Sequence, residues 1–465
     1  MPSFIVCGDI MLDQNLFVKA EKLANEAPIP VFGLQREEFA LGGCGNVVKN
    51  LAGLGLGDVH VFSAVGCDQA GDQIETLVKG GGGVSHLRRV EGYTTTVKRR
   101  YFCDNKVIFR CDTEVFLSSI CVPTGIGAEI ERLLKTGDVR CIFLSDYNKG
   151  FLKAELCQEI LRLARTYGVF TCVDPKQDYT KYNGCSLIKP NRKEACALLQ
   201  VDSSTPLLDL HKRMFSVVQP KYSVITLAEN GTTLYDGVNM IHELPVVRKI
   251  IDVTGAGDVV CAVLGAFLCD GGDPGKVLRM ATRIATKSVE FPGTYTATRA
   301  DLAPASKVVG VDETRARTQG KRVIFTNGCF DLLHSGHISL FKYCKDLGGE
   351  VVVGLNSDAS IRRLKGATRP VNTLQTRLDV LEAIQYIDFI VVFEEDTPSQ
   401  VLESLRPDIL VKGGDYAVES IVGREFAGET RVCSFVEGVS STATIQRIQG
   451  IQGLSSSYES SKESS

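Results

Sequence analysis

This 465-residue sequence lacks the features that would mark a membrane, secreted or nucleic-acid-binding protein. No apolar run approaches the roughly eighteen residues that a membrane helix needs. The first residues lack the basic start and long apolar stretch of a signal peptide, so we expect residues 1–6 to form a β-strand. The formal net charge of −3 gives no electrostatic reason for binding nucleic acid or an acidic membrane surface. We therefore expect neither kind of partner.

The sixteen cysteines include no C-x-x-C pair, and four of the six histidines are scattered singly. Structural zinc sites usually contain closely spaced ligand pairs such as C-x-x-C, and disulfide frameworks are typical of short secreted domains. The spacing therefore predicts reduced thiols in a cytoplasmic protein without structural zinc.

Short apolar, β-branched runs alternate with helical stretches along most of the chain, as at residues 141–144 and 223–226. Strands that are apolar on both faces and alternate with helices are typical of a doubly wound, mainly parallel α/β sheet. Residues 92–112 instead resemble a hairpin that turns at residues 103–105. Together with strands near residues 10–18 and 30–38, this hairpin predicts a small antiparallel β-lid.

The chain is too long for one hydrophobic core, so its length indicates two to three domains. The pattern breaks near residues 300–320, where little can be buried, and a new strand begins at residue 322. We predict a first domain at residues 1–302, a linker at 303–320, a second α/β domain at 321–454 and a disordered tail at 455–465.

The strongest motif of the first half is D-V-T-G-A-G-D at residues 252–258, which an apolar helical run follows. The backbone amides of Gly255, Ala256 and Gly257 can point into one concavity, to which the helix N-terminus adds positive charge. Asp258 is placed to take a proton from an attacking hydroxyl. The alternative is that Asp258 only caps the helix and the glycines only form a turn.

Further polar groups of the first half fit a polyhydroxylated ligand. Gly42, Gly43 and Asn46 precede a helical stretch, and Asp9 and Asp13 flank the end of the first strand as acceptors for sugar hydroxyls.

A metal role is also open to the first half. Asn191 and Glu194 lie three residues apart and can hold Mg²⁺ through water, although N-x-x-E is usually a capping arrangement.

These motifs resemble the PfkB, or ribokinase, family of carbohydrate kinases. The resemblance implies a ribokinase-like fold with a β-lid over the sugar, often shared in a homodimer. It also implies ATP as substrate, an anion hole at Gly255, Ala256 and Gly257, Asp258 as catalytic base, and Mg²⁺ near Glu194. No G-x-x-x-x-G-K-[ST] loop is present, so the phosphate cradle must be this one.

The second half contains two histidines three residues apart, His334 and His337, between a strand and a helix. Across the intervening glycine, both imidazoles can donate to charge that develops at an attacked α-phosphorus, each contributing about 3 kcal/mol. A zinc pair is the alternative, but no third ligand is nearby and the spacing is not that of a metalloprotease.

This motif matches the HxGH superfamily of nucleotidyltransferases, which implies a Rossmann-like second domain. Twelve further residues are then candidates for the nucleotide site: Asn327, Gly328, Phe330, Asp331, Lys365, Arg377, Lys412, Gly413, Asp415, Ser440, Ser441 and Thr442. In the first domain, Asn191 and Glu194 are the corresponding candidates.

The order of kinase and transferase resembles the family of fused heptose 7-phosphate kinases and heptose 1-phosphate adenylyltransferases. Segments at residues 144–150, 173–176 and 369–372 extend the likeness over nearly the whole chain. The resemblance implies phosphorylation of D-glycero-β-D-manno-heptose 7-phosphate at O1, removal of the 7-phosphate by a separate phosphatase, and adenylyl transfer from ATP to give ADP-heptose and pyrophosphate.

A substrate that already carries a phosphate at O7 requires basic residues in the sugar pocket, and Lys98 and Arg110 on the predicted lid are the candidates. Local motifs leave two alternatives open. The same fusion can act on another sugar phosphate with CTP as donor, or one domain can be a non-catalytic binding module.

Overall fold

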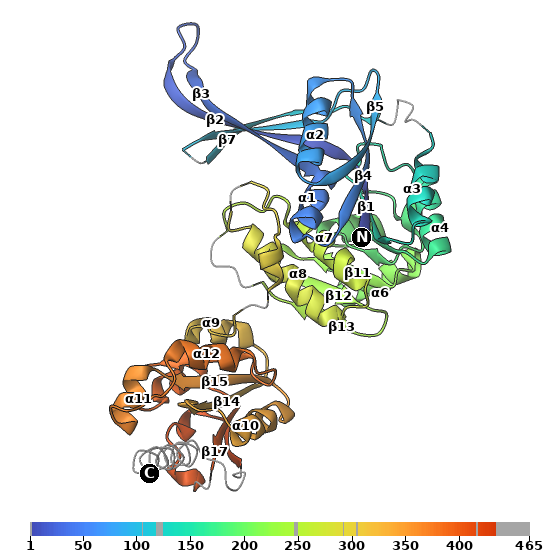
Figure 1. Ribbon diagram of the computed structural model, residues 1–465. Helices are drawn as coiled ribbons and strands as arrows, with labels where there is room; N and C mark the ends of the chain where they lie inside the picture. Colours follow the sequence, from blue (N-terminus) through green and yellow to red (C-terminus); the bar gives the residue numbers. More distant parts are fainter. Residues whose placement is uncertain are drawn as a thin grey trace, which may run out of the picture. The chain divides into compact units, whose positions relative to one another are not determined.

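The computed structural model describes residues 2–104, 106–117, 124–245, 250–291, 293–303, 306–414 and 417–433. The chain divides into two compact units, Met1–Ala303 and Pro304–Ser465 (Figure 1). Over the described ranges, no helix is long and apolar enough to cross a membrane. Four predicted nucleotide contacts, Asp415, Ser440, Ser441 and Thr442, and the predicted tail lie outside these ranges.

The first unit is built on a nine-stranded sheet with the order β13-β12-β11-β10-β9-β8-β1-β4-β5. Its strands are β1 (Ser3–Gly8), β4 (Asp58–Gly66), β5 (Gly83–Val90), β8 (Val139–Ser145), β9 (Phe170–Asp174), β10 (Leu187–Ile188), β11 (Tyr222–Thr226), β12 (Thr232–Tyr235) and β13 (Met240–Glu243). The strands from β11 to β5 pair in parallel, and β12 and β13 are added antiparallel at one edge. The predicted mainly parallel sheet and the predicted first strand are confirmed.

Helices cover both faces of this sheet (Figure 1). One face contacts α1 (Cys44–Leu54), α2 (Gln69–Gly80), α7 (Ala256–Leu268) and α8 (Pro274–Ser288). The other contacts α3 (Ile126–Leu134), α4 (Ala154–Tyr167), α5 (Arg192–Leu199) and α6 (Leu207–Val218).

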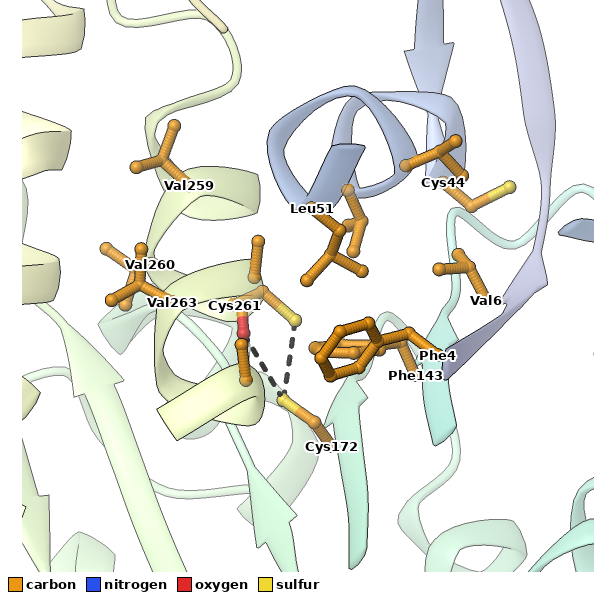
Figure 2. Packing of buried hydrophobic residues seen from close by; sticks show 14 of the residues in the cluster. Phe4, Val6, Cys44, Leu51, Phe143, Cys172, Val259, Val260, Cys261 and Val263 are labelled. Carbon is orange, nitrogen blue, oxygen red and sulfur yellow. Dashed lines mark hydrogen bonds between the residues drawn. The ribbon is translucent and has the colours of Figure 1, made fainter. Parts of the chain in front are cut away.

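Alternate residues of β1 belong to two separate cores, because successive side chains of a strand point to opposite faces. Phe4 and Val6 pack with α1 and α7, whereas Ile5 and Cys7 pack with α3 and α4. In the first core, Cys172 and Cys261 approach to 3.5 Å between their sulfurs without a disulfide (Figure 2). These buried thiols are core residues, as the cysteine spacing predicts.

The predicted lid is a four-stranded sheet in the order β3-β2-β6-β7, and its β2–β3 hairpin extends away from the body of the first unit (Figure 1). Its strands are β2 (Ile10–Leu23), β3 (Pro30–Gly43), β6 (Val97–Cys103) and β7 (Lys106–Thr113). Each hairpin is antiparallel, but β2 and β6 pair in parallel, so the prediction of an antiparallel lid is wrong at this junction. The strands β2 and β6 follow β1 and β5, which are themselves parallel to β4, and therefore enter the lid in the same direction.

The described residues of the second unit form a sheet of five parallel strands in the order β16-β15-β14-β17-β18. They are β14 (Val323–Gly328), β15 (Glu350–Asn356), β16 (Phe389–Phe393), β17 (Ile409–Gly413) and β18 (Glu429–Cys433). The helices are α10 (Ser335–Asp346), α11 (Asp358–Lys365), α12 (Leu374–Glu382) and α13 (Ser399–Leu405), and apolar clusters lie on both faces. The strand order reverses between β14 and β17, where open α/β sheets bind ligands.

The predicted linker at residues 303–320 differs from the structure. It contains helix α9 (Val311–Thr318), and the amide of Val309 donates to Ile390 of β16 at 3.0 Å. Val309 and two threonines of α9 are buried. Much of this segment therefore belongs to the second unit, because a few small and β-branched residues suffice to cover the sheet edge even though the segment is rich in charge.

Short 3₁₀ helices complete the described structure: η2 (Tyr179–Tyr182), η3 (Ala228–Asn230), η4 (Arg299–Leu302), η5 (Val418–Ser420) and η6 (Arg424–Phe426).

Candidate active sites

Asp258 is the third residue of α7, and its carboxylate is almost completely buried. Its side chain does not cap the helix, whose N-cap is Gly255. Instead, the phenol of Tyr147 donates to Asp258 Oδ1 at 2.8 Å and the amide of Asn46 donates to Oδ2 at 3.1 Å. The alternative of a simple capping aspartate is therefore wrong.

The surroundings of Asp258 have opposing effects on its protonation. Burial raises the pKa of Asp258, and the hydrogen bonds from Tyr147 and Asn46 and the charges of Lys189 and Lys49 oppose this rise. A carboxylate with a raised pKa is better matched to accept a proton from a hydroxyl group.

The amides of Gly255, Ala256 and Gly257 lie at the N-terminus of α7, as predicted. Gly255 has φ of 81°, a left-handed conformation that favours glycine. A Cβ at Gly257 would lie 3.6 Å from the ammonium of Lys189. A buried cation therefore stands beside the predicted anion cradle.

Lys189 is paired with Asp174 at 3.0 Å, and both side chains are largely inaccessible to solvent. Burial raises the pKa of Asp174 to about 7, while the charge of Lys189 opposes the rise. Burial disfavours the charge of Lys189, but Asp174 outweighs it, so the pKa of Lys189 is raised. Sequence reasoning missed this lysine, although it directly precedes the Pro-Asn of the N-x-x-E motif.

Several predicted sugar contacts come together on the strands of the lid. Asp13 and Lys98 are register partners on β2 and β6, and the Lys98 ammonium lies 5.8 Å from the ring centre of Tyr147. A Cβ at Gly42 would lie 2.7 Å from Asp13 Oδ2, so only glycine allows this approach. Gly43 has φ of 60°. Asp13 also accepts a hydrogen bond from Arg100 at 2.7 Å, a contact that the sequence did not reveal.

Two predicted sugar ligands have other contacts. Asp9 accepts the backbone amides of Tyr147, Lys149 and Phe151 at 2.9, 3.0 and 3.1 Å, so its buried carboxylate holds a loop. Arg110 lies on β7 with its side chain 49% exposed and bonded to Asp112 of the same strand.

Asn191 and Glu194 form the capping box of α5. Asn191 Oδ1 accepts the amide of Glu194 at 2.9 Å, and Glu194 Oε2 accepts the amide of Asn191 at 3.0 Å. The other oxygen of Glu194 binds Lys176 at 2.6 Å. The capping arrangement that competes with the metal role is thus present.

The second unit has a cavity of about 580 Å³ at the carboxyl ends of β14 and β17. The predicted residues that line it are Asn327, Gly328, Phe330, Asp331, His334, His337, Lys365, Lys412 and Gly413. The remaining walls include residues 396–398 and 420–422, which were not among the predicted site residues.

His334 is the N-cap residue of α10, and its ring stacks on that of His337 with a centroid distance of 3.8 Å. The backbone amide of His334 donates to Nδ1 of His337 at 3.3 Å. Burial lowers the pKa of His337 to about 4, helped by His334 and Lys365, and burial also lowers the pKa of His334. Near neutral pH, His337 is therefore uncharged with its proton on Nε2, which makes this nitrogen a donor.

Lys412 donates to Asn327 Oδ1 at 2.8 Å, which ties the end of β17 to the end of β14. Burial lowers the pKa of Lys412. Phe330 has φ of 44°, which is uncommon for a bulky residue, and its ring meets His337 edge-on at 5.2 Å. The ring of Phe330 therefore contacts His337 as well as the apolar core of the second unit.

Arg377 is not one of the described residues that line the cavity. Its guanidinium is buried and donates to the carbonyls of Cys329 and Asn356, at 2.8 Å each, and to Asp358 at 2.7 Å. The prediction that Arg377 contacts the nucleotide is therefore corrected, because two backbone carbonyls and the Asp358 carboxylate accept from its two terminal nitrogens.

Asp331 likewise uses its carboxylate internally. It accepts the amides of Val371 and Asn372 at 3.0 and 2.9 Å and is paired with Arg369.

In the described part of the chain, no group of three or more potential ligands could hold a metal ion, so His334 and His337 have no third zinc ligand there.

Comparisons with known proteins agree with the two sites. A model of the pfkB family of carbohydrate kinases matches residues 1–301, and a cytidylyltransferase-like model matches residues 325–451. The bifunctional protein HldE of Campylobacter fetus is 38% identical over 97% of this chain and 100% of that relative. HldE of Geobacter sulfurreducens is 39% identical over 96% of this chain and 95% of that relative.

Among solved structures, phosphofructokinase-2 from Escherichia coli in complex with substrates and products matches with a TM-score of 0.51. The identity is 17%, and the match covers 64% of this chain and 96% of that chain. At this identity, the match supports the fold alone.

Proposed function

The chain belongs to the family of the bifunctional HldE proteins, and from this premise we propose how its two units divide the chemistry. The chain is a carbohydrate kinase joined to a nucleotidyltransferase. The first unit phosphorylates D-glycero-β-D-manno-heptose 7-phosphate at O1 with ATP. The second transfers an adenylyl group from ATP to heptose 1-phosphate, giving ADP-heptose and pyrophosphate. A different sugar phosphate with CTP is not favoured, since the likeness to HldE spans nearly the whole chain.

In the first unit, the observation that carries the proposal is the buried Asp258 at the N-terminus of α7. Asp258 takes the proton of the O1 hydroxyl, whose oxygen attacks the γ-phosphorus of ATP, and ADP leaves. The amides of Gly255, Ala256 and Gly257 bind the transferring phosphoryl oxygens, with Lys189 behind them. Lys98, which is next to Asp13 and Tyr147, is the proposed partner of the 7-phosphate.

Glu194 fits Mg²⁺ only through an intervening water, because one oxygen is paired with Lys176 and the other accepts a backbone amide. Its hard carboxylate oxygens are the donor type that Mg²⁺ prefers, and this ion commonly keeps several waters and binds substrate phosphates. When bound, Mg²⁺ would neutralise phosphate charge. Glu194 and Asn191 would orient its hydration shell.

In the second unit, the 1-phosphate attacks the α-phosphorus of ATP, and pyrophosphate leaves. His337 donates from Nε2 to the α-phosphate oxygens, and His334 lies against it. Lys365 and Lys412 at the cavity wall supply positive charge for the phosphates. Asn327 holds the Lys412 ammonium in place.

The product of the first unit still carries the 7-phosphate, so the proposal requires a separate phosphatase between the two reactions. We also propose that the protein is cytoplasmic, because the spacing of its cysteines predicts reduced thiols.

A homodimer is also proposed, with a second copy contacting the lid. The lid exposes large apolar side chains on β3 and β7, including Leu34 and Phe109, each 57% exposed. Sedimentation of the full chain should show a dimer, and a Leu34→Asp/Phe109→Asp variant should shift it toward monomer.

The experiment that tests the function follows both reactions by mass spectrometry, with heptose 7-phosphate and ATP and then with heptose 1-phosphate and ATP. Asp258→Asn should abolish formation of the bisphosphate and leave ADP-heptose formation unchanged. His337→Ala should do the reverse. Release of ADP without a sugar bisphosphate, or loss of both activities in either variant, would contradict the proposal.

A further inference from the structure

Tyr147 belongs to the loop that follows β8, and its phenol contacts the carboxylate of Asp258 at the start of α7. The distance from its oxygen to Asp258 Oδ1 is 2.8 Å. Tyr147 lies in the segment 144–150 that extends the family likeness, but the sequence predicts no catalytic role for it. The loop that carries it is itself held in place.

Asp9 fixes this loop. Its two oxygens accept the backbone amides of Tyr147, Lys149 and Phe151, and Asp9 lies at the end of the adjacent parallel strand β1. A buried carboxylate that accepts three amides holds the backbone from Tyr147 to Phe151 in one conformation.

We infer that Tyr147 is a positioning residue for the catalytic base, whose ionised form its phenol stabilises, with Asp9 as the anchor of its loop. This inference rests on the proposed function of Asp258 in the kinase reaction. Asn46 holds the second oxygen of Asp258 from helix α1. Two donors on different elements therefore fix the plane of the carboxylate, and each oxygen keeps further acceptor capacity for the substrate hydroxyl.

The phenol acts as a donor throughout the working range, because burial and the charge of Asp258 raise the pKa of Tyr147 well above its usual value. Other titratable groups also face Asp258 from the neighbouring elements. They are Lys49 and Cys44 of α1, Asp174 at the end of β9, and Lys189 after β10. None of these is altered by a change confined to the phenol oxygen.

The sign of the expected effect follows from the hydrogen bond. A bond to Asp258 favours the ionised form, so its removal raises the pKa of the base. The base must be ionised to accept a proton, and the acidic limb of the kinase rate profile therefore moves to higher pH. A hydrogen bond to a charged group corresponds to a shift of roughly one to two pH units.

The test is Tyr147→Phe in the full chain, with kcat and kcat/KM of the kinase measured against pH. We expect the acidic limb to move upward by about one pH unit. The kinase rate should fall about tenfold on that limb and return to near the wild-type value on the plateau at higher pH. Adenylyl transfer by the same preparation should be unchanged.

Tyr235→Phe is the matched control. Tyr235 lies in β12 of the same unit, and its phenol donates to the carbonyl of Gly237 at 2.7 Å. This variant loses one phenol hydrogen bond without touching Asp258, so its kinase profile should superimpose on that of the wild type.

Two results would overturn the inference: a Tyr147→Phe profile that superimposes on the wild type, or a rate that falls equally at every pH. Asp258→Asn, measured in parallel, separates this failure from failure of the proposed function. If Asp258→Asn keeps its kinase activity, the base is misassigned and the role of Tyr147 falls with it. If Asp258→Asn is inactive and the Tyr147→Phe profile is unshifted, only the positioning role is wrong.

Discussion

Replacement of Arg377 by methionine separates a residue that binds the nucleotide from one that holds the site together. In the structure, its buried guanidinium joins the ends of β14 and β15 to the start of α11, through Cys329, Asn356 and Asp358. Methionine retains much of the side-chain volume but removes every donor. Two carbonyls and one carboxylate then lose their partner in a buried setting.

The magnitude follows from these contacts. Removal of one partner of a buried ion pair costs about 3–5 kcal/mol. Asp358 is 27% exposed, so water can partly replace the lost donor, and we expect a loss near the lower end, about 3 kcal/mol. For a unit of this size, each kcal/mol lowers the melting temperature by about 2–4 °C, which gives a fall on the order of 10 °C.

The assay combines thermal unfolding of the full chain with both enzyme activities. In Arg377→Met, the unfolding transition of the second unit should fall and adenylyl transfer should be lost, while the kinase rate and the transition of the first unit stay unchanged. Arg315→Met is the matched control, because Arg315 is an exposed residue of α9 in the same unit. The reasoning is refuted if the melting temperature is unchanged and only the KM for ATP rises, which is the signature of a direct nucleotide contact.

Three further predictions concern single features of the sites. Gly255→Ala and Gly271→Ala both place a side chain at positive φ, 81° and 76°, and each should lower the free energy of urea unfolding by about 1 kcal/mol. Only Gly255→Ala should lower the kinase rate, and equal rates in the two variants would contradict phosphate binding at Gly255. Lys189→Met should destabilise the first unit by about 3 kcal/mol by leaving Asp174 unpaired, and Lys189→Met/Asp174→Leu should recover much of that loss; a double variant no more stable than the single one would count against the pair. The pKa of His337 is about 4 in the folded chain and about 6.5 in the unfolded chain, so the unfolded chain takes up the proton first as pH falls. The second unit therefore loses stability between pH 6.5 and 4, by at most about 3 kcal/mol and by less because His337 is partly exposed. Between pH 6.5 and 5, the stability of His337→Gln should depend less on pH than that of the wild type, and identical slopes would refute this.

Most of the fold was predictable because most strands and helices have a local signature, although the charge-rich helix α9 does not. Apolar runs such as Val351–Leu355 are buried on both faces, which only a covered parallel sheet requires. The pairing of β2 with β6 was not predictable in this way. It depends on the direction in which β1 and β5 run, and this is set by the whole sheet and by no residue of the lid.

Residues whose backbone geometry is part of their function could also be found from the sequence. Gly255 and His334 lie at the helix N-termini where their motifs predict them. The contact between Tyr147 and Asp258 could not, because these residues are 111 apart in the sequence and meet only where α7 packs against the sheet beside the end of β8. A tyrosine in a loop has no local pattern that announces a carboxylate partner.

Two carboxylates show where sequence reasoning reaches its limit. Asp9 and Asp331 each follow a buried parallel strand, at the sheet edge where ligands bind. The strand-end position predicted that Asp9 contacts substrate, and the HxGH resemblance predicted the same of Asp331. In the structure, each accepts backbone amides of a distant loop instead: residues 147–151 in the first unit and 371–372 in the second. A carboxylate only accepts hydrogen bonds, and the amides of a loop that leaves a sheet need acceptors as much as a sugar hydroxyl does. The strand-end position therefore predicts that such a carboxylate serves the site, but only the path of the neighbouring loops decides whether it does so by binding substrate or by holding the loop that does.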